Sequence, residues 1–222
     1  MKNLASYIDH TLLAQDASFN QIKKLCDEAK EHNFCSVCVN SSYVAFAKEN
    51  TKDSNVKVCS VVGFPLGAMS TKAKAYEAKE AIKDGADEID MVINVGWLKS
   101  GRVDLVKEDI KALREATEGK VLKVILETAL LNEEEIKEVC QIAKELKVDF
   151  VKTSTGFSTR GASLEDIKIF KSVVGDEIGI KASGGIRSYE KAIEMIEAGA
   201  TRLGTSSGIA IVKGLEGKKE TY

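Results

Sequence analysis

Residues 84–93, "DGADEIDMVI", contain the pattern that decides the fold. The glycine in this stretch ends a predicted helix, and the residues after it alternate between apolar and charged side chains, as in a β-strand. One face of that strand carries Ile89, Met91 and Ile93, and the other carries Glu88 and Asp90. Because the apolar face must pack against helices, the charged face points into a different space. The stretch therefore predicts a sheet whose second face encloses acidic groups.

The same succession of a short strand and a longer helical pattern recurs along the chain. Strands are expected at 6–9, 34–39, 56–62, 87–93, 121–127, 149–153, 178–182 and 201–204. Helices are expected at 18–32, 41–50, 71–84, 102–118, 132–147, 163–174 and 188–198. Repeated βα units with right-handed crossovers form either an open doubly wound sheet or a closed barrel. Eight units in 222 residues, with no G-x-G-x-x-G motif, predict an α/β fold of the (β/α)₈ TIM-barrel type.

Charged residues occupy one face of several predicted strands. That face would line the barrel with Asp9, Asp90, Lys123, Glu127, Lys152 and Lys181. Such an interior is costly unless the charges pair, and valine or leucine would serve stability better. The charges also lie toward the carboxyl ends of the strands, where barrel enzymes have their active sites. We interpret them as a functional site, with a structural ion-pair lattice as the alternative.

The composition is that of one domain with an aliphatic core. Hydrophobic residues make up 44% of the chain and aromatic residues 6%, and the formal net charge is -2. We expect a single domain over 1–222, with a flexible tail from about residue 213. The balanced charge gives no reason to expect a nucleic-acid or membrane partner. No apolar run reaches the ~18 residues of a membrane span, and the start lacks a signal-peptide pattern, so a cytoplasmic protein is expected.

The cysteines and histidines do not suggest a metal site. The five cysteines are irregularly spaced, which argues against a disulfide framework. Cys35 and Cys38 form a C-x-x-C, but residues three apart on a strand point to opposite faces. The only histidines are His10 and His32, whereas a catalytic zinc usually takes three protein ligands, often histidines. We therefore expect no metal and no other cofactor.

Two lysines on neighbouring strands, Lys152 and Lys181, should face the same space. Mutual repulsion and removal from water lower the pKa of one of them. A lysine with its pKa near 10.4 in water needs a value of about 7–8 to supply a neutral amine, which can attack a carbonyl and form a Schiff base. Asp90 beside them would move protons and keep the second lysine charged. The pattern does not decide which lysine attacks, and simple neutralisation of Asp90 and Glu127 is the alternative role.

Two segments near the end of the chain are suited to binding a phosphate. "ASGGIRS" (182–188) and "GTSSG" (204–208) follow the seventh and eighth predicted strands, the usual place for phosphate in barrels. The candidate groups are the backbone amides of Gly184 and Gly185 and the hydroxyls of Ser206 and Ser207. The arginine of the first segment either adds charge or faces solvent. Ordinary turn chemistry would explain both segments without a ligand.

Long parts of the chain resemble one enzyme family. "DEIDMVINVG", "FVKTSTGF" and "IKASGGIRS" are similar to signature segments of deoxyribose-phosphate aldolases. The similarity continues through "YIDHTLL", "VVGFPLGAMSTKAKAYEA" and "RLGTSSG", and covers nearly all of residues 4–212. It implies a metal-free class I aldolase that reversibly cleaves 2-deoxy-D-ribose 5-phosphate to D-glyceraldehyde 3-phosphate and acetaldehyde. It also implies a homodimer or homotetramer.

The resemblance further implies roles for individual residues. Lys152, in "KTSTG", matches the Schiff-base nucleophile, Lys181 the second lysine, and Asp90 the aspartate that relays protons with water. The phosphate-binding segments match Gly184, Gly185, Ser206 and Ser207, and Thr155 is a further candidate for binding substrate. Additional candidate site residues are Asp9, Asn40 and Glu127.

Two features differ from the family pattern or extend it. Arg160-Gly161 stands where the family commonly has Gly-Gly, which would change the loop or add positive charge near the phosphate. Some members end in a tyrosine that reaches the active site, and this chain ends in Tyr222. The hypothesis is that deleting Tyr222 slows proton transfer.

Two other functions fit the predicted fold. One is a phosphosugar isomerase or epimerase that uses Asp90 and a second carboxylate as proton carriers. The other is a non-catalytic barrel that binds sugar phosphates and does not need both lysines. Borohydride trapping of substrate on Lys152 separates the aldolase from both.

Overall fold

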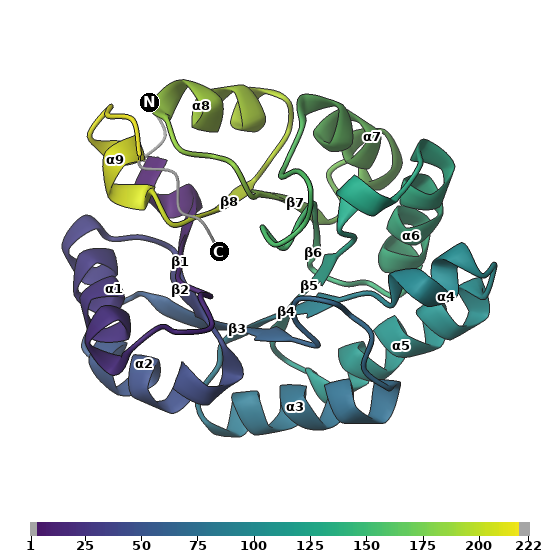
Figure 1. Ribbon diagram of the computed structural model, residues 1–222, viewed down its shortest axis with the longest axis horizontal. Coiled ribbons are helices and arrows are strands. Elements are labelled where there is room, and N and C mark those ends of the chain that lie inside the picture. Colours follow the sequence, from purple (N-terminus) through teal and green to yellow (C-terminus); the bar gives the residue numbers. More distant parts are fainter. Residues whose placement is uncertain (1–3, 218–222) are drawn as a thin grey trace.

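The computed structural model describes residues 4–217, which form a closed barrel of eight parallel strands in the order of the sequence (Figure 1). The strands are β1 (Ile8–Thr11), β2 (Ser36–Val39), β3 (Lys57–Val62), β4 (Glu88–Val92), β5 (Val121–Ile125), β6 (Phe150–Lys152), β7 (Gly179–Ser183) and β8 (Arg202–Thr205). Pairing of β1 with β8 closes the ring. The predicted (β/α)₈ barrel is confirmed.

Helices surround the barrel and cover its outer face (Figure 1). They are α1 (Phe19–His32), α2 (Val44–Thr51), α3 (Thr71–Lys83), α4 (Val95–Lys99), α5 (Val103–Ala116), α6 (Glu133–Glu145), α7 (Leu164–Val174), α8 (Tyr189–Glu197) and α9 (Gly208–Val212). Short 3-10 helices are η1 (Leu4–Tyr7), η2 (Ser41–Tyr43) and η3 (Thr128–Leu130). The seven expected helices are present. The sequence pattern missed α4, α9 and the 3-10 turns, because about one turn of helix is too short to show an apolar period.

The two faces of the sheet differ as expected, with apolar side chains on the outer face and charged side chains on the inner face. The outward residues Ile89, Met91, Leu122 and Val124 are fully buried in the layer between strands and helices. Inward side chains make contacts between strands that are not neighbours in the sheet. Asp90 of β4, for example, bonds Lys181 of β7 at 2.8 Å. Such a contact is possible only across the interior of the barrel, so the charged face does point inward.

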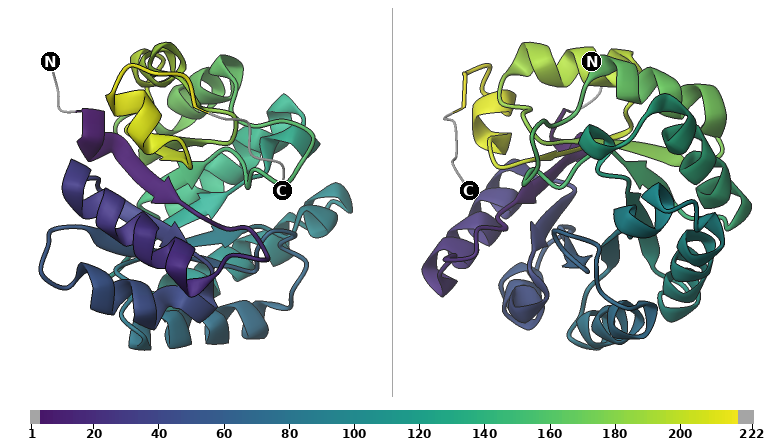
Figure 2. Two further views of the ribbon diagram at one scale, coloured as in Figure 1. Left: turned by 60° about the vertical axis from the view of Figure 1, so that its left-hand side comes forward. Right: turned by 45° about the vertical axis from the view of Figure 1, so that its right-hand side comes forward.

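The last helix, α9, packs beside the first elements of the chain. Figure 2 shows α9 next to η1 and β1, on the side where the ring of strands is joined. After α9, Leu215 donates a backbone hydrogen bond to Ala210, and Gly217 donates one to Arg187. Tyr222 lies outside the described residues. Within residues 4–217, no helix combines the length and apolarity that crossing a membrane requires.

Candidate active site

One carboxylate lies at the centre of the barrel interior and bonds three lysines. Asp90 Oδ2 accepts hydrogen bonds from the Nζ atoms of Lys152 and Lys181, each at 2.8 Å. Asp90 Oδ1 accepts from Lys123 Nζ, also at 2.8 Å. All four side chains are buried. The register explains the meeting, since Asp90 lies opposite Lys123 and Lys152 lies opposite Lys181 on adjacent strands.

A second layer of charges supports this cluster from below. Asp9 Oδ2 lies 2.5 Å from Lys181 Nζ, and Asp9 Oδ1 accepts from Arg202 at 2.8 Å. Glu88 lies 2.5 Å from Lys123 Nζ and 3.1 Å from Arg202. The charges thus form one continuous lattice, in which each buried charge has an opposite neighbour.

The sequence did not single out Glu88 and Arg202 as members of this lattice. Glu88 shares the inward face with Asp90, and this was the signal that could have found it. Arg202 stands at the start of β8, where its guanidinium lies 5.1 Å from the centre of the Phe150 ring. Strand alternation places it inward with Gly204, so the same rule that found Lys181 would have found Arg202.

The lattice fixes the charge state of its members. Burial alone would raise the pKa of Asp90, but Lys123, Lys152 and Lys181 hold it well below its usual range. Burial alone would also raise the pKa of Asp9, and Lys181 and Arg202 hold it down in the same way. For Lys181, burial favours the neutral form, but Asp9 and Asp90 outweigh it and raise the pKa. Asp9 and Asp90 therefore favour the charged form of Lys181, so it is not the lysine whose pKa the sequence expected to be lowered.

Lys152 is the lattice lysine that reaches an open pocket. Parallel strands place this pocket at the carboxyl end of the barrel, where Lys152 ends β6. The lining residues are Thr11, Leu13, Lys152, Thr155, Gly156, Phe157, Ser183, Gly184, Gly185, Ile186, Arg187, Gly204, Thr205 and Ser206. Five of the candidates named from the sequence are therefore brought together, namely Lys152, Thr155, Gly184, Gly185 and Ser206. Arg187 also lines the pocket, so it does not face solvent alone.

The candidates that do not line this pocket include Ser207, Asn40 and Asp9. Ser207 lines a neighbouring groove between α1 and α9, and its backbone N–H donates to Thr205 Oγ1 at 2.9 Å. The turn after β8 directs consecutive residues to different sides, so only Ser206 faces the Lys152 pocket. Asn40 donates to the Leu13 carbonyl at 3.3 Å and so supports a pocket residue. Asp9 lies in the lattice beneath the pocket.

Glu127 lies beside the pocket on a strained backbone. Its φ is +45°, which is uncommon for a residue with a side chain and is found mainly where a site demands it. One carboxylate oxygen accepts from Thr155 Oγ1, while the other, Oε1, is buried and has no hydrogen-bond partner among the described residues. Burial raises the pKa of Glu127, and the Thr155 bonds and Lys152 only partly oppose this. Glu127 is therefore a carboxylate held at an energetic cost next to a pocket residue.

Arg160 does not add charge to the phosphate segments. Its guanidinium donates to both oxygens of Asp166, at 2.6 and 3.0 Å, and to the Thr128 carbonyl at 3.1 Å. It therefore ties the β6–α7 loop to the first turn of α7. The neighbouring Gly161 is in tight contact, because a β-carbon there would lie 2.1 Å from the Gly184 carbonyl oxygen. The chain keeps glycine at the one position of the pair that touches a pocket loop.

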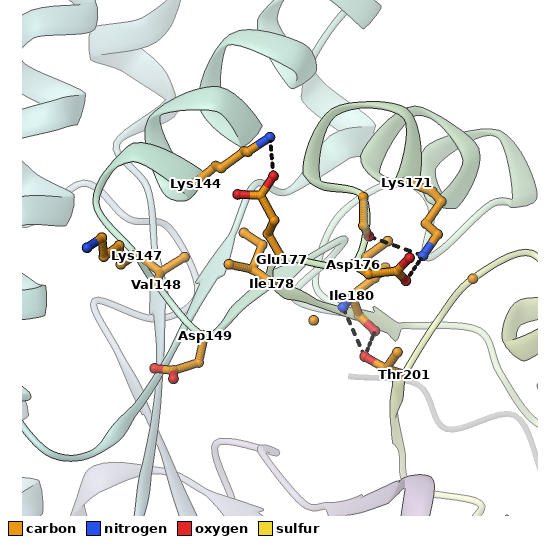
Figure 3. A pocket seen from close by; sticks show the side chains of 13 residues that line it. Lys144, Lys147, Val148, Asp149, Lys171, Asp176, Glu177, Ile178, Ile180 and Thr201 are labelled. Atoms are coloured by element: carbon orange, nitrogen blue, oxygen red, sulfur yellow. Dashed lines mark hydrogen bonds and ion pairs between the residues drawn. The ribbon is translucent and has the colours of Figure 1, made fainter.

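A larger depression at the opposite end of the barrel carries none of this chemistry. Figure 3 shows its side chains, which come from the segments that enter β6, β7 and β8. Lys144 pairs with Glu177 at 2.7 Å, and Lys171 pairs with Asp176. These are surface ion pairs at the amino ends of the strands, where conserved barrel chemistry is not found.

The closed parallel barrel, with a lysine–carboxylate cluster beneath a pocket at its carboxyl end, defines a (β/α)₈-barrel enzyme with a lysine-based site. The family model described as DeoC/LacD family aldolase matches residues 4–214. The chain belongs to this family.

Relatives and solved structures agree with this assignment. A deoxyribose-phosphate aldolase of Finegoldia magna is 61% identical, over 95% of this chain and 99% of the relative. One of Mannheimia succiniciproducens is 56% identical, over 100% of this chain and 99% of the relative. A solved deoxyribose phosphate aldolase of Aeropyrum pernix, described as having a unique tetrameric structure, has a TM-score of 0.88 and 33% identity, and the match covers 95% of this chain and 89% of that one.

Proposed function

We propose that this chain is a deoxyribose-phosphate aldolase, which reversibly cleaves 2-deoxy-D-ribose 5-phosphate to D-glyceraldehyde 3-phosphate and acetaldehyde. The observation that carries the proposal is the sharing of Asp90 Oδ2 by Lys152 and Lys181. This arrangement brings together an amine (Lys152), a cation (Lys181) and a proton carrier (Asp90). The high identity to relatives of that name supports the same substrate. No observation favours the isomerase or the non-catalytic barrel.

In the proposed reaction, Lys152 is the nucleophile. Its unprotonated Nζ adds to the aldehyde carbon C1, and loss of water gives a protonated Schiff base. A base removes the C3 hydroxyl proton, the C2–C3 bond breaks, and its electron pair moves through C2 to the nitrogen. Glyceraldehyde 3-phosphate leaves and an enamine remains on Lys152. Protonation at C2 and addition of water then release acetaldehyde and restore the amine.

Asp90 is proposed to relay protons, with water, during this cycle. In the resting enzyme the cations Lys123, Lys152 and Lys181 hold the pKa of Asp90 low and make it a weak base. Lys152 must pass its proton through Asp90 and water before its amine can attack. The enamine stage replaces one of those cations by a neutral group. The basicity of Asp90 therefore rises at the point where a proton must be moved. Lys181 remains charged beside it, held by Asp9, and favours the anionic character that develops near C3.

The substrate phosphate is proposed to lie against Gly184, Gly185 and Ser206. Both glycines have positive φ, at +82° and +77°, so their amides can turn toward an anion where other residues would be strained. Arg187 lines the same pocket and adds positive charge. This arrangement leaves the sugar to extend from the loops down toward Lys152.

The proposal is tested by borohydride reduction in the presence of deoxyribose 5-phosphate, followed by peptide mass spectrometry. We expect a stable adduct on Lys152. Lys152→Arg, which keeps the positive charge and lacks a primary amine, is the matched control and should form none. An adduct on Lys181 instead would reverse the two roles. Turnover without any trapped lysine would remove the Schiff-base mechanism.

We further propose a homodimer or homotetramer that works in the cytoplasm, in the degradation of deoxyribose phosphate. Large apolar side chains on the surface, including Phe19, Leu66 and Tyr76, offer area for association. Charged phosphosugars do not cross bilayers, which favours an enzyme in the compartment where they form. Light scattering coupled to gel filtration would determine the oligomeric state, and a monomer would contradict the first part.

A further inference from the structure

Two cysteines face Asp90 inside the barrel and form a group that no step of the proposed reaction uses. Cys38 of β2 and Cys59 of β3 are partners in the register of adjacent strands. Their sulfurs and one oxygen of Asp90 all lie within 4.8 Å of one another, and all three residues are buried. Cys59 Sγ lies 3.1 Å from Asp90 Oδ1. The C-x-x-C partner Cys35 is not in this group, as strand alternation predicted.

The spacing suits a tetrahedral ion with sulfur ligands. Zinc bonds sulfur at about 2.3 Å and carboxylate oxygen at about 2.0–2.2 Å, so its ligand atoms lie about 3.5–3.8 Å apart. Ligation therefore requires the three donor atoms, which lie within 4.8 Å of one another, to adjust to those distances by side-chain rotation. Two thiolates with one carboxylate are a donor set that favours zinc, cadmium and similar thiophilic ions over magnesium or calcium.

The surrounding lysines do not prevent binding, because the exchange leaves the charge unchanged. A divalent ion that binds two thiolates displaces two thiol protons, so the interior gains two charges and loses two. Lys123 must give up Asp90 Oδ1 and its 3.4 Å contact with Cys59 Sγ, and it keeps Glu88 at 2.5 Å. The desolvation penalty of leaving a buried ammonium unpaired is thereby avoided.

An ion can reach the group by the route that the substrate takes. The pocket extends from the loops to Lys152, whose Nζ touches Asp90. Thr11 also lines the pocket, and it lies opposite Cys38 on the adjacent strand. Leu13 lines the pocket and packs in one apolar cluster with Cys38 and Cys59, so the cysteines lie next to the pocket wall.

We propose that Cys38, Cys59 and Asp90 form an inhibitory site for a thiophilic divalent cation, with zinc as the probe. The bound ion would hold Asp90 and prevent it from relaying protons. The inhibition rests on the proposed function, whereas the binding does not. Substrate and ion would compete, because they use one pocket and one carboxylate.

The test uses the full chain kept reduced with a phosphine. Titration calorimetry with zinc, in buffers of different ionisation enthalpy, should give one ion per chain and release of about two protons per ion. Cadmium should produce thiolate-to-metal charge-transfer absorption. Saturating zinc should lower turnover at least tenfold, and EDTA should restore it.

Cysteine variants locate the ion. Cys59→Ala and Cys38→Ala should each weaken binding by at least about 100-fold and abolish the cadmium band. Circular dichroism checks that each variant is folded, and either one suffices for the test. Cys35→Ser, which removes the most exposed cysteine, is the matched control and should bind as the native chain does.

Several outcomes would overturn the proposal. Binding that is lost in Cys35→Ser and kept in Cys59→Ala would place the ion elsewhere. Tight binding at the cysteines without loss of turnover would remove the inhibitory role. Inhibition that appears only when the phosphine is omitted, and that EDTA does not reverse, would indicate a Cys38–Cys59 disulfide in place of a metal. Failure of the aldolase assay itself leaves the calorimetric and cadmium results to decide the binding.

Discussion

A single carboxylate oxygen organises the chemistry at the scale of the residue. Asp90 Oδ2 contacts both Lys152 and Lys181, so the two amines share one space, as the sequence required. Their difference comes from what else each one touches. Lys181 is also bound by Asp9 and is fully enclosed, while Lys152 lies at the edge of a pocket. The two lysines therefore have different surroundings, which is the basis for the different roles proposed for them.

Glu127 carries a prediction about stability. Its Oε1 is buried without a described partner, and burial raises its pKa. An acid whose pKa is higher in the folded state destabilises the fold as pH rises above its unfolded pKa, because the unfolded chain ionises first, and the full cost is reached above the folded pKa. We therefore expect Glu127→Gln to stabilise the protein at pH 7 by about 1–3 kcal/mol and to have little effect near pH 4.

Urea unfolding of both proteins at the two pH values measures this difference. A variant that is less stable than the native chain at pH 7 would show that the ionised carboxylate is favourably bound. The same pair of proteins also gives the contribution of Glu127 to turnover, measured as separate changes in kcat and KM.

At the scale of the element, the loops after β6 and β7 determine the shape of the pocket together. Ala162 donates backbone hydrogen bonds to Ser183 and Gly184, and Gly161 packs on Gly184. Arg160 holds the first of these loops to α7 through Asp166. The amides proposed to bind the phosphate are therefore positioned by a neighbouring loop as well as by their own strand.

Gly161→Ala should disrupt this contact. The new β-carbon would lie 2.1 Å from the Gly184 carbonyl oxygen, so one loop must move. We expect KM for deoxyribose 5-phosphate to rise at least tenfold, with a smaller loss in kcat, because the displaced amides face the phosphate and Lys152 is untouched.

Gly119→Ala provides the control for this substitution. Gly119 precedes β5 and has open space around it, although its φ is positive, so the change adds backbone strain far from the pocket. Its KM should be unchanged. An equal loss in both variants, or a fall in kcat alone for Gly161→Ala, would contradict a role of the loop contact in binding phosphate.

At the scale of the whole molecule, a charge lattice inside the barrel adds to the apolar layer between the strands and the helices. The lattice pairs three carboxylates, Asp9, Glu88 and Asp90, with four cations, Lys123, Lys152, Lys181 and Arg202. Breaking a buried pair costs roughly 3–5 kcal/mol, so the lattice also holds the strands together.

This lattice predicts the dependence of stability on pH. The folded-state pKa values of Asp9 and Asp90 are lowered, so their stabilisation is fully present above the unfolded value of about 4 and is lost as pH falls below it. The raised pKa of Lys181 gives stabilisation that persists up to about pH 10.4 and is lost above that. These groups keep their charges between about pH 5 and 9, so they should not lower the unfolding free energy in that range. Below about pH 4 the unfolding free energy should drop steeply.

Urea titrations from pH 2 to 9 measure this profile, with Asp9→Asn as the variant. It should be less stable at neutral pH and should lose less stability below pH 4. A native profile that already falls between pH 6 and 5, with the same steepness in Asp9→Asn, would show that these carboxylates do not control acid unfolding.

The sequence by itself determined the barrel, the inward lysines and Asp90, and the two loops that offer an anion site. These follow from a period of two in strands, which fixes the face of every side chain once the apolar face is known. Other features were not predictable in this way, because each depends on contacts between segments. They are the short helices α4 and α9, the turn that separates Ser206 from Ser207, and the ion pair of Arg160 with Asp166.

The tertiary structure alone decided which charges meet. Closure of the barrel brings Lys123, Lys152 and Lys181 to Asp90. It also adds Glu88 and Arg202 to the lattice and places Cys38 and Cys59 beside the same carboxylate. A strand pattern gives the direction of a side chain but not its distance from residues on strands that are not its neighbours. Ionisation depends on those distances, and so the different surroundings of Lys152 and Lys181 follow only from the closure of the eight strands.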